Sequence, residues 1–534
     1  MTLDRSLVNG RIIDGTGAPW FRGAVGIADG RIEGVYRGEV PDAKEVIDLD
    51  GKVVCPGFID THSHSDLQLF KDPPLSPKIR QGITTEILGQ DGFSMAPMHR
   101  EGGAEEWSSH LSALAGSVDV DWSWGSVDDY LSAVESSGVG PHVALMVGHG
   151  TVRFNVMGMS DAKPSDAQLA EMQELVAEGL KDGAAGFSTG LIYTPCTYAD
   201  TEEISELAAP LAEYGRPFVA HVRSEGRWIW EALDEFIDIG AERNVPLHLS
   251  HYKLAGTGQQ GMVNRSNALI RTARERDVDI TVEQYPYTAG STMLSATLPP
   301  WVHAEGPDRV VELLQDEDAR ERIRRDIHEW RIDGWENLAG LGGWDSIVIT
   351  NVESEANETL EGKTIASVAS DRGVHPVEAV CDLLVEEELA VSMLSYMMDP
   401  DDVERILTTD LVNVATDGLF GGRPHPRLAG TYPRVLGTYA RERNALSMEE
   451  AVRKMTSLPA RAMGFRRKGL IRDGMDADLV VFDPQTVESR ATYDEPLRPP
   501  RGMPHVLVDG EFVVEDGEVT GETPGRALRV GENA

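Results

Sequence analysis

Two histidines one residue apart, His62 and His64, directly follow a short apolar segment at 57–60. In an extended strand residues i and i+2 point to the same face, so both imidazoles would face one point beyond the strand end. That arrangement is typical of a metal site. The alternative is a pair of exposed loop histidines, and the apolar strand immediately before the pair favours the metal site.

Single histidines and aspartates also end later apolar segments of the chain. In order they are Asp91, His149, His221, His251 and Asp417. One such residue is usually structural, but several at the ends of successive strands are difficult to explain by packing alone. Imidazole and carboxylate groups bind Zn²⁺ while leaving a coordination position for water. The pattern therefore indicates a metal-dependent hydrolase.

These residues need a fold that brings strand ends together. Predicted strands occupy 57–60, 84–88, 142–147, 186–188, 217–221, 246–251, 279–284 and 411–415, and amphipathic segments at 165–181, 202–214, 229–238 and 267–275 lie between them. This alternation predicts right-handed βαβ units, and eight strands predict an α/β fold of the closed (β/α)8 TIM type, whose strand ends converge on one site. An open doubly wound sheet is the alternative, but no Gly-x-Gly-x-x-Gly follows the first strand.

Three further regions complete the predicted architecture. Short strands fill 1–55 and again 471–534, where Asp509-Gly510 and Asp516-Gly517 are hairpin turns, and we expect both ends to pair into one small β-sandwich. The barrel then spans 56–470. Its connection between strands seven and eight is too long for a plain loop, so an insertion at about 301–400 should form a subdomain or lid. Within it the sequence predicts helices at 309–328 and 376–387 and a strand at 346–352.

The composition limits the possible partners. The chain has 88 acidic and 49 basic residues, a formal net charge of −39 and only ten lysines. Such a surface argues against nucleic acid and anionic membranes, because phosphate contacts need Lys and Arg. The acidic excess is spread along the chain, which favours a halophilic protein, since the Debye length falls to ~3 Å at about 1 M salt. The alternative is an ordinary acidic cytosolic enzyme.

Cysteine usage and the N-terminus bear on the compartment. Cys55, Cys196 and Cys381 are widely spaced and indicate neither a disulfide framework nor a Cys-x-x-Cys zinc site. The N-terminus has no basic segment followed by an apolar run, and no window approaches ~18 uncharged apolar residues. We therefore expect a soluble cytoplasmic protein, and assembly into a homo-oligomer stays open.

The site residues and the segments around them resemble the amidohydrolase superfamily and, within it, the D-aminoacylases (N-acyl-D-amino-acid deacylases). The resemblance covers nearly the whole chain. It rests on the segments 56–66, 82–85, 148–149, 186–195, 221–226, 246–253, 285–292, 416–418, 425–427 and 456–459. The closing segment 474–483 is typical of the superfamily in general and says little about the substrate.

The resemblance implies one or two zinc ions and a hydrolytic mechanism. It places His62 and His64 on one metal position, His221 and His251 on the other, and Asp417 as the catalytic acid/base. Zinc would lower the pKa of a bound water to about 7 and polarise an amide carbonyl. Asp417 would take the proton of that water and deliver it to the leaving amine. The implied reaction releases a carboxylic acid and a D-amino acid from an N-acyl-D-amino acid.

One segment departs from the family pattern. After the second strand the family usually has Asn-Cys-Gly, with the cysteine as a metal ligand, whereas this chain has Gln90-Asp91-Gly92. Asp91 can replace the thiolate as a harder ligand. Glu86 within the second strand is the rival ligand, unless it faces the helices. Because strand four has no lysine that could act as a bridge, either carboxylate must supply any bridging oxygen, or only one metal binds tightly.

Further residues are implied to bind the substrate. Lys253 and Tyr193 would contact its carboxylate, since a cation and a phenol suit an anion. A surface ion pair is the alternative for Lys253. Ser291 and Arg427 would add hydrogen bonds. His149 would orient a ligand or the carbonyl oxygen, or else it is a core histidine whose ring nitrogens are both satisfied.

Two other functions remain open. Hydrolysis of a cyclic amide or imide, or of a dipeptide, could use the same metal site, since fold and ligands do not determine the substrate. A non-catalytic metal-binding scaffold is the other alternative. It would be expected to have lost Asp417 or a histidine ligand, and the sequence retains them all.

Overall fold

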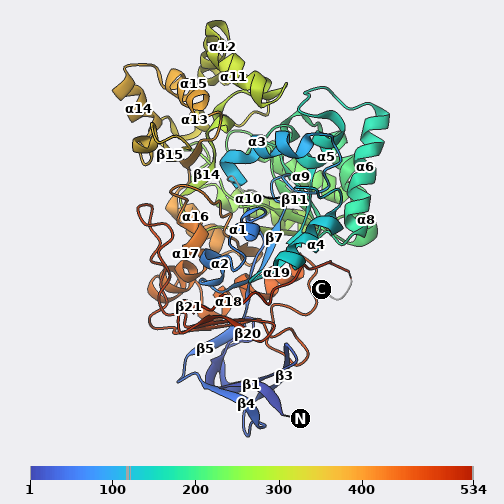
Figure 1. The fold of residues 1–534 in the computed structure, drawn as a ribbon, viewed down its shortest axis with the longest axis vertical. Helices are drawn as coiled ribbons and strands as arrows, with labels where there is room; N and C mark the ends of the chain where they lie inside the picture. Colours follow the sequence, from blue (N-terminus) through green and yellow to red (C-terminus); the bar gives the residue numbers. More distant parts are fainter. Residues whose placement is uncertain (1, 116–119, 121, 532–534) are drawn as a thin grey trace.

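The computed structural model describes residues 2–115, 120 and 122–531. Figure 1 shows a central body of strands and helices between two other parts, a β-sheet beside the N-terminus and a helical lobe that carries α11 to α15. Among the described residues, every helix is too short or too polar to cross a lipid bilayer.

The central body contains parallel strands at the predicted places. They are β6 (Phe58–Asp60), β7 (Ile83–Leu88), β8 (His142–Leu145), β9 (Val147–Gly148), β10 (Phe187–Gly190), β11 (Phe218–His221), β12 (Leu247–Leu249), β13 (Ile280–Gln284) and β17 (Val412–Val414). The predicted third strand is divided at Met146 into β8, which pairs with β7, and β9, which pairs with β10. The resulting sheets run β6-β7-β8 and β9-β10-β11-β12-β13-β17.

The first and last of these strands meet just beyond their ends. Ser63 forms an isolated parallel bridge with Gly418. The Asp417 amide donates to the carbonyl of His62 at 2.9 Å. Two segments more than 350 residues apart in sequence are therefore held side by side, and both carry predicted site residues.

Amphipathic helices connect the strands, as the hydrophobic spacing predicts. In α9 (Ile229–Arg243), for example, Leu233, Phe236 and Ile239 are buried. Others are α5 (His149–Met157), α6 (Asp166–Lys181), α7 (Thr201–Ala208), α8 (Leu211–Tyr214), α10 (Val263–Glu275), α16 (Pro400–Leu407) and α17 (Arg427–Arg434). The single helix predicted over 202–214 is wrong: α7 ends at Ala208 and α8 begins after Pro210, which has no N–H to continue the ladder.

The region between β13 and β17 has a sheet and a hydrophobic core of its own. Its antiparallel strands are β14 (Ala289–Met293), β15 (Ile347–Asn351) and β16 (Ser392–Tyr396), and its helices include α11 (Pro307–Gln315), α12 (Glu317–Glu329), α13 (Leu338–Gly342), α14 (Ile365–Arg372) and α15 (Pro376–Glu386). The helix predicted over 309–328 is in fact two. Asp316 is extended between them, and its carboxylate accepts from the Ala319 amide as the N-cap of α12.

The two ends of the chain form one nine-stranded sheet. Its strands are β1 (Leu3–Ile12), β2 (Phe21–Ala28), β3 (Arg31–Tyr36), β4 (Ala43–Asp48), β5 (Val53–Pro56), β18 (Leu479–Phe482), β19 (His505–Val508), β20 (Glu511–Glu515) and β21 (Glu518–Val519). The junction between the ends is the antiparallel pair β5 and β18. The predicted hairpins are confirmed: Asp509, Gly510, Asp516 and Gly517 all have positive φ, as type I′ turns require.

Candidate metal centre

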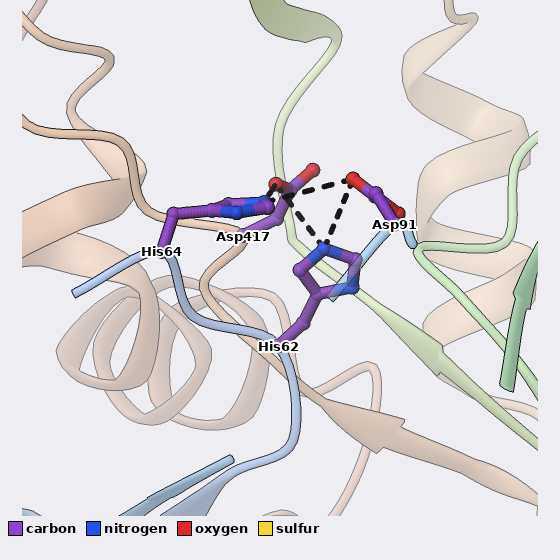
Figure 2. Close-up of side chains that lie close together, drawn as sticks. All are labelled: His62, His64, Asp91 and Asp417. Atoms are coloured by element: carbon purple, nitrogen blue, oxygen red, sulfur yellow. Dashed lines mark ion pairs between the residues drawn. The ribbon is translucent and has the colours of Figure 1, made fainter. Parts of the chain in front are cut away.

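Four predicted site residues from three strand ends converge on one point. Figure 2 shows the imidazoles of His62 and His64 facing the carboxylates of Asp91 and Asp417. The Nε2 atom of His62 lies 3.4 Å from Asp91 Oδ2 and 3.6 Å from Asp417 Oδ1. The Nε2 atom of His64 lies 3.6 Å and 3.4 Å from the same two oxygens. These four side chains are buried and close enough to hold one metal ion.

Asp91 also belongs to a second group, with His221 and His251. Its Oδ1 atom lies 3.8 Å from His221 Nδ1 and 3.5 Å from His251 Nε2. One oxygen of Asp91 thus faces the first histidine pair and the other oxygen faces the second. Asp91 is the residue that the two groups share.

The backbone is constrained at three of these positions. Asp91, His251 and Asp417 have φ values of 55°, 29° and 49°. Positive φ is uncommon for residues with a side chain, although Asp and His adopt it more readily than most, and such positions occur in turns and cluster at functional sites. Each residue directly follows a strand end or a short loop, so the unusual backbone redirects its side chain toward the shared centre.

Several buried polar atoms at this centre lack a conventional partner. Within the described part of the chain, His62 Nε2, Asp91 Oδ1 and both ring nitrogens of His221 have no hydrogen-bond partner. Buried polar groups are normally satisfied. The unpartnered atoms are imidazole nitrogens and a carboxylate oxygen, which are ligands that a divalent cation accepts. The residues therefore fit a metal centre.

The charges of the centre act on one another. Burial opposes ionisation, but the negative charges of Asp91, Asp417 and Glu283 raise the pKa of His62 well above its ordinary value. Burial likewise raises the pKa of Asp417, yet the positive charge of Arg427 and then that of His62 hold it far below its usual range. These charges keep Asp417 ionised.

Glu86, the rival to Asp91, lies elsewhere. Its Oε1 atom is 3.0 Å from the ammonium of Lys78 and accepts from the Ser63 hydroxyl at 3.2 Å. Glu86 is fully buried in β7, and neither of the two His and Asp groups described above includes it. This geometry favours Asp91 as the shared ligand.

Three of the predicted substrate residues, Lys253, Tyr193 and Arg427, contact residues of the centre. Lys253 is 4% exposed and pairs with Glu225, so the alternative of a surface ion pair is wrong. The Tyr193 hydroxyl lies 2.9 Å from that of Thr292 in β14, and its ring stands edge-on to that of His221. Arg427 lies 2.9 Å from Asp417 Oδ2 and donates to the carbonyl of Ser291 at 3.2 Å.

His149 lies apart from these residues. Its Nδ1 is 2.8 Å from the Thr189 hydroxyl and its Nε2 is 3.1 Å from a carboxylate oxygen of Glu203. Both ring nitrogens are therefore engaged by core neighbours, and the side chain is fully buried. This geometry supports the interpretation as a satisfied core histidine instead of a substrate contact.

The sequence profile of the amidohydrolase family matches residues 45–514. The chain belongs to the amidohydrolase family. Among its relatives, a D-aminoacylase from Alcaligenes xylosoxydans xylosoxydans is 35% identical over 98% of this chain and 97% of its own length. An N-acyl-D-glutamate deacylase from the same organism is 33% identical over 99% of this chain and 96% of its own length.

A solved structure is similar over the same length. It is that of an N-acyl-D-glutamate deacylase from Bordetella bronchiseptica, complexed with zinc and a phosphonate inhibitor that mimics the tetrahedral intermediate of the reaction. The two structures align with a TM-score of 0.84 at 34% identity, covering 99% of this chain and 100% of the other.

In this amidohydrolase two buried glutamates that the sequence analysis missed hold candidate ligands. Glu283 in β13 lies 2.6 Å from His62 Nδ1 and 2.9 Å from His248 Nε2. Glu225 lies 2.9 Å from His251 Nδ1 and also accepts from Lys253. A carboxylate on the outer nitrogen orients an imidazole and increases its basicity as a ligand. The sequence signals were weak: Glu283 is an acidic residue inside a predicted strand, and Glu225 lies four residues after the predicted strand that ends at His221.

Proposed function

We propose that this amidohydrolase cleaves the amide bond of N-acyl-D-amino acids and releases a carboxylic acid and a D-amino acid. The observation that carries the proposal is the sharing of Asp91 between two histidine pairs beside Asp417. Similarity over the full length to deacylases of N-acyl-D-amino acids supports the substrate class.

The proposed cofactor is Zn²⁺. His62, His64, Asp91, His221 and His251 would hold one or two ions, with Asp91 common to both positions. When bound, zinc supplies a water whose pKa is lowered to about 7 and polarises the amide carbonyl. Soft thiolate ligands are replaced here by a carboxylate, so this centre should tolerate harder divalent metals better than a cysteine-containing site.

Asp417 would move the proton. As an ionised carboxylate next to Arg427 it can take a proton from the attacking water and give it to the leaving nitrogen. Lys253 and Tyr193, with Ser291 and Arg427, would bind the carboxylate of the substrate. Glu225 keeps Lys253 next to His251, whose Nδ1 atom is 2.7 Å from the ammonium, so carboxylate binding and metal binding share one rigid element.

A substrate screen tests the proposal. In buffer with zinc and KCl, we expect N-acetyl-D-amino acids to be hydrolysed with kcat/KM about 100-fold or more above their L enantiomers, because the carboxylate clamp and the reacting carbonyl fix two substituents of the chiral centre and the wall of the site would then admit the side chain in one of the two remaining positions. Released amine is measured, with cyclic imides and dipeptides in parallel. Faster turnover of a cyclic imide or a dipeptide would replace the proposed substrate class.

We also infer the finer architecture. The bridge from Ser63 to Gly418 supports closure of the parallel strands into a (β/α)8 barrel at 56–470. In the terminal sheet Val480 and Val481 point to opposite faces, and Val481 is buried in a hydrophobic cluster that joins residues of both chain ends, among them Leu7 and Leu507. This burial supports a β-sandwich that is built from 1–55 and 471–534.

Adaptation to high salt is a further proposal. Of the ten lysines, Lys78, Lys253, Lys454 and Lys468 are buried, so the surface has even less positive charge than the composition indicates. Self-repulsion of the remaining negative charge should weaken the fold at low ionic strength.

We therefore expect the melting temperature to rise by about 10 °C or more between 0.1 M and 2 M KCl. Differential scanning calorimetry measures it. Sucrose at matched osmolality is the control, because it favours burial without screening charge and should give a smaller rise. A flat dependence on KCl would rule out the halophilic interpretation.

A further inference from the structure

Lys78 is a fully buried lysine beneath the metal centre. It lies in the short helix α2 (Ser76–Ile79), and its side chain is 0% exposed. Lysine is almost never fully buried unless it is paired. Its surroundings therefore show what it is paired with.

The Lys78 ammonium contacts four oxygen atoms from three strand ends. It donates at 2.8 Å to Asp60 Oδ2, to the Ser63 hydroxyl and to the Thr416 hydroxyl. Glu86 Oε1 lies at 3.0 Å. Ser63 stands between His62 and His64 in the chain, and Thr416 directly precedes Asp417. One ammonium thus joins the two segments that carry three of the candidate site residues.

Backbone contacts hold the first of these segments unevenly: the His62 carbonyl accepts from the Asp417 amide at 2.9 Å, but the bonds at Ser63 and His64 are longer. The Ser63 amide donates to the carbonyl of Ile87 at 3.3 Å and the His64 amide to that of Gly418 at 3.4 Å, both long for such bonds. The charged bonds of Lys78 are shorter, and bonds to charged groups are roughly twice as strong as neutral ones. The ammonium therefore adds a charged restraint at Ser63, between the two histidines, where the backbone bonds are long.

We propose that Lys78 is a positioning residue of the metal centre, which fixes Ser63 and Thr416 so that His62, His64 and Asp417 keep one arrangement. The inference rests on the metal site of the proposed function. Lys78 contacts neither substrate nor metal in this role.

A second buried lysine provides a matched control. Lys454 is also 0% exposed, but it lies at the opposite end of β17, where it donates to the carbonyls of Thr409 and Val412. Loss of either lysine should destabilise the fold, because the buried groups around it lose their oppositely charged partner or their hydrogen-bond donor. Only loss of Lys78 should change the metal centre.

The test is the double variant Lys78→Met/Glu86→Gln. It removes one positive and one negative charge, so the net charge of the cluster with Asp60 is unchanged and folding is favoured over that of Lys78→Met alone. We expect zinc affinity, measured by competition with a chelator, to fall about 10- to 100-fold. The visible spectrum of the Co²⁺-loaded protein should also change. The single variant Glu86→Gln measures how much of the change in zinc affinity comes from replacing the Glu86 carboxylate by a carboxamide.

Lys454→Met should lower the melting temperature and leave zinc affinity and the cobalt spectrum unchanged. Ser63→Ala, which keeps every charge, should weaken zinc binding in the same direction and by less. Unchanged zinc affinity in both the double variant and Ser63→Ala would overturn the inference. A protein that binds zinc but hydrolyses no N-acyl-D-amino acid would overturn the proposed substrate alone, because the readout for Lys78 is metal binding.

Discussion

Asp417→Asn is expected to retain zinc and to lose about 10²- to 10⁴-fold in kcat. The amide keeps the shape of the carboxylate and an oxygen toward His62 and His64, but it cannot accept a proton from water. It also loses the charge that pairs with Arg427, whose guanidinium lies 2.9 Å from the carboxylate. Elemental analysis and rate on the same preparation measure both effects.

Asp402→Asn is the matched control for this change. Asp402 is as buried as Asp417, but it lies in α16 and accepts from the Gly261 amide, away from the metal centre. Its replacement should change stability and not kcat. An Asp417→Asn enzyme that keeps most of its activity would exclude the acid/base role.

The second large effect is expected at Asp91. Because its two oxygens face the two histidine pairs, Asp91→Ala should remove at least one metal ion and nearly all activity. Asp91→Cys should recover part of the metal binding, since a thiolate is a softer ligand that zinc also accepts. Metal content per chain after gel filtration is the measurement.

Glu86→Gln gives the contrast. Because the Glu86 carboxylate pairs with the Lys78 ammonium, the variant should keep its metal content when zinc is supplied in excess. The opposite pair of results, full metal content in Asp91→Ala and loss of metal in Glu86→Gln, would transfer the ligand role to Glu86.

Much of the fold could be predicted because its signals are local. The hairpins at 509–510 and 516–517 follow from Asp-Gly, and short apolar runs mark most strands of the central body. The helix predicted over 309–328 overlooked a change of phase: on one continuous helix with 3.6 residues per turn, buried Val310 and Leu314 would face away from buried Ala319, Ile323 and Ile327. Asp316, the N-cap of α12, marks the point where this change occurs.

The candidate site was predictable only in its inner part. His62, Asp91 and Asp417 each follow the end of a predicted strand, and that regularity can be recognised in the sequence alone. Glu283 acts on His62, 221 residues away in sequence, and Lys78 on Ser63, 15 residues away, so nothing local distinguishes them from other charged residues. His149 also follows the end of a predicted strand, but its ring nitrogens contact Thr189 and Glu203. Position in the sequence therefore does not distinguish a core histidine from one at the centre.

The pairing of β5 with β18 also links folding to the time course of synthesis. β5 ends at residue 56 and β18 begins at residue 479, so a ribosome that adds about 5–20 residues per second needs roughly 20–85 s to deliver the partner strand. Among the strand pairings of the described residues, β5 until then has only its short parallel contact with β1 at Arg11 and Ile12. The nascent chain therefore carries an open strand edge while the whole central body is made, and an open edge is where a chain pairs with other chains. Protection of that edge during translation, more than the stability of the finished enzyme, should limit the yield of native protein.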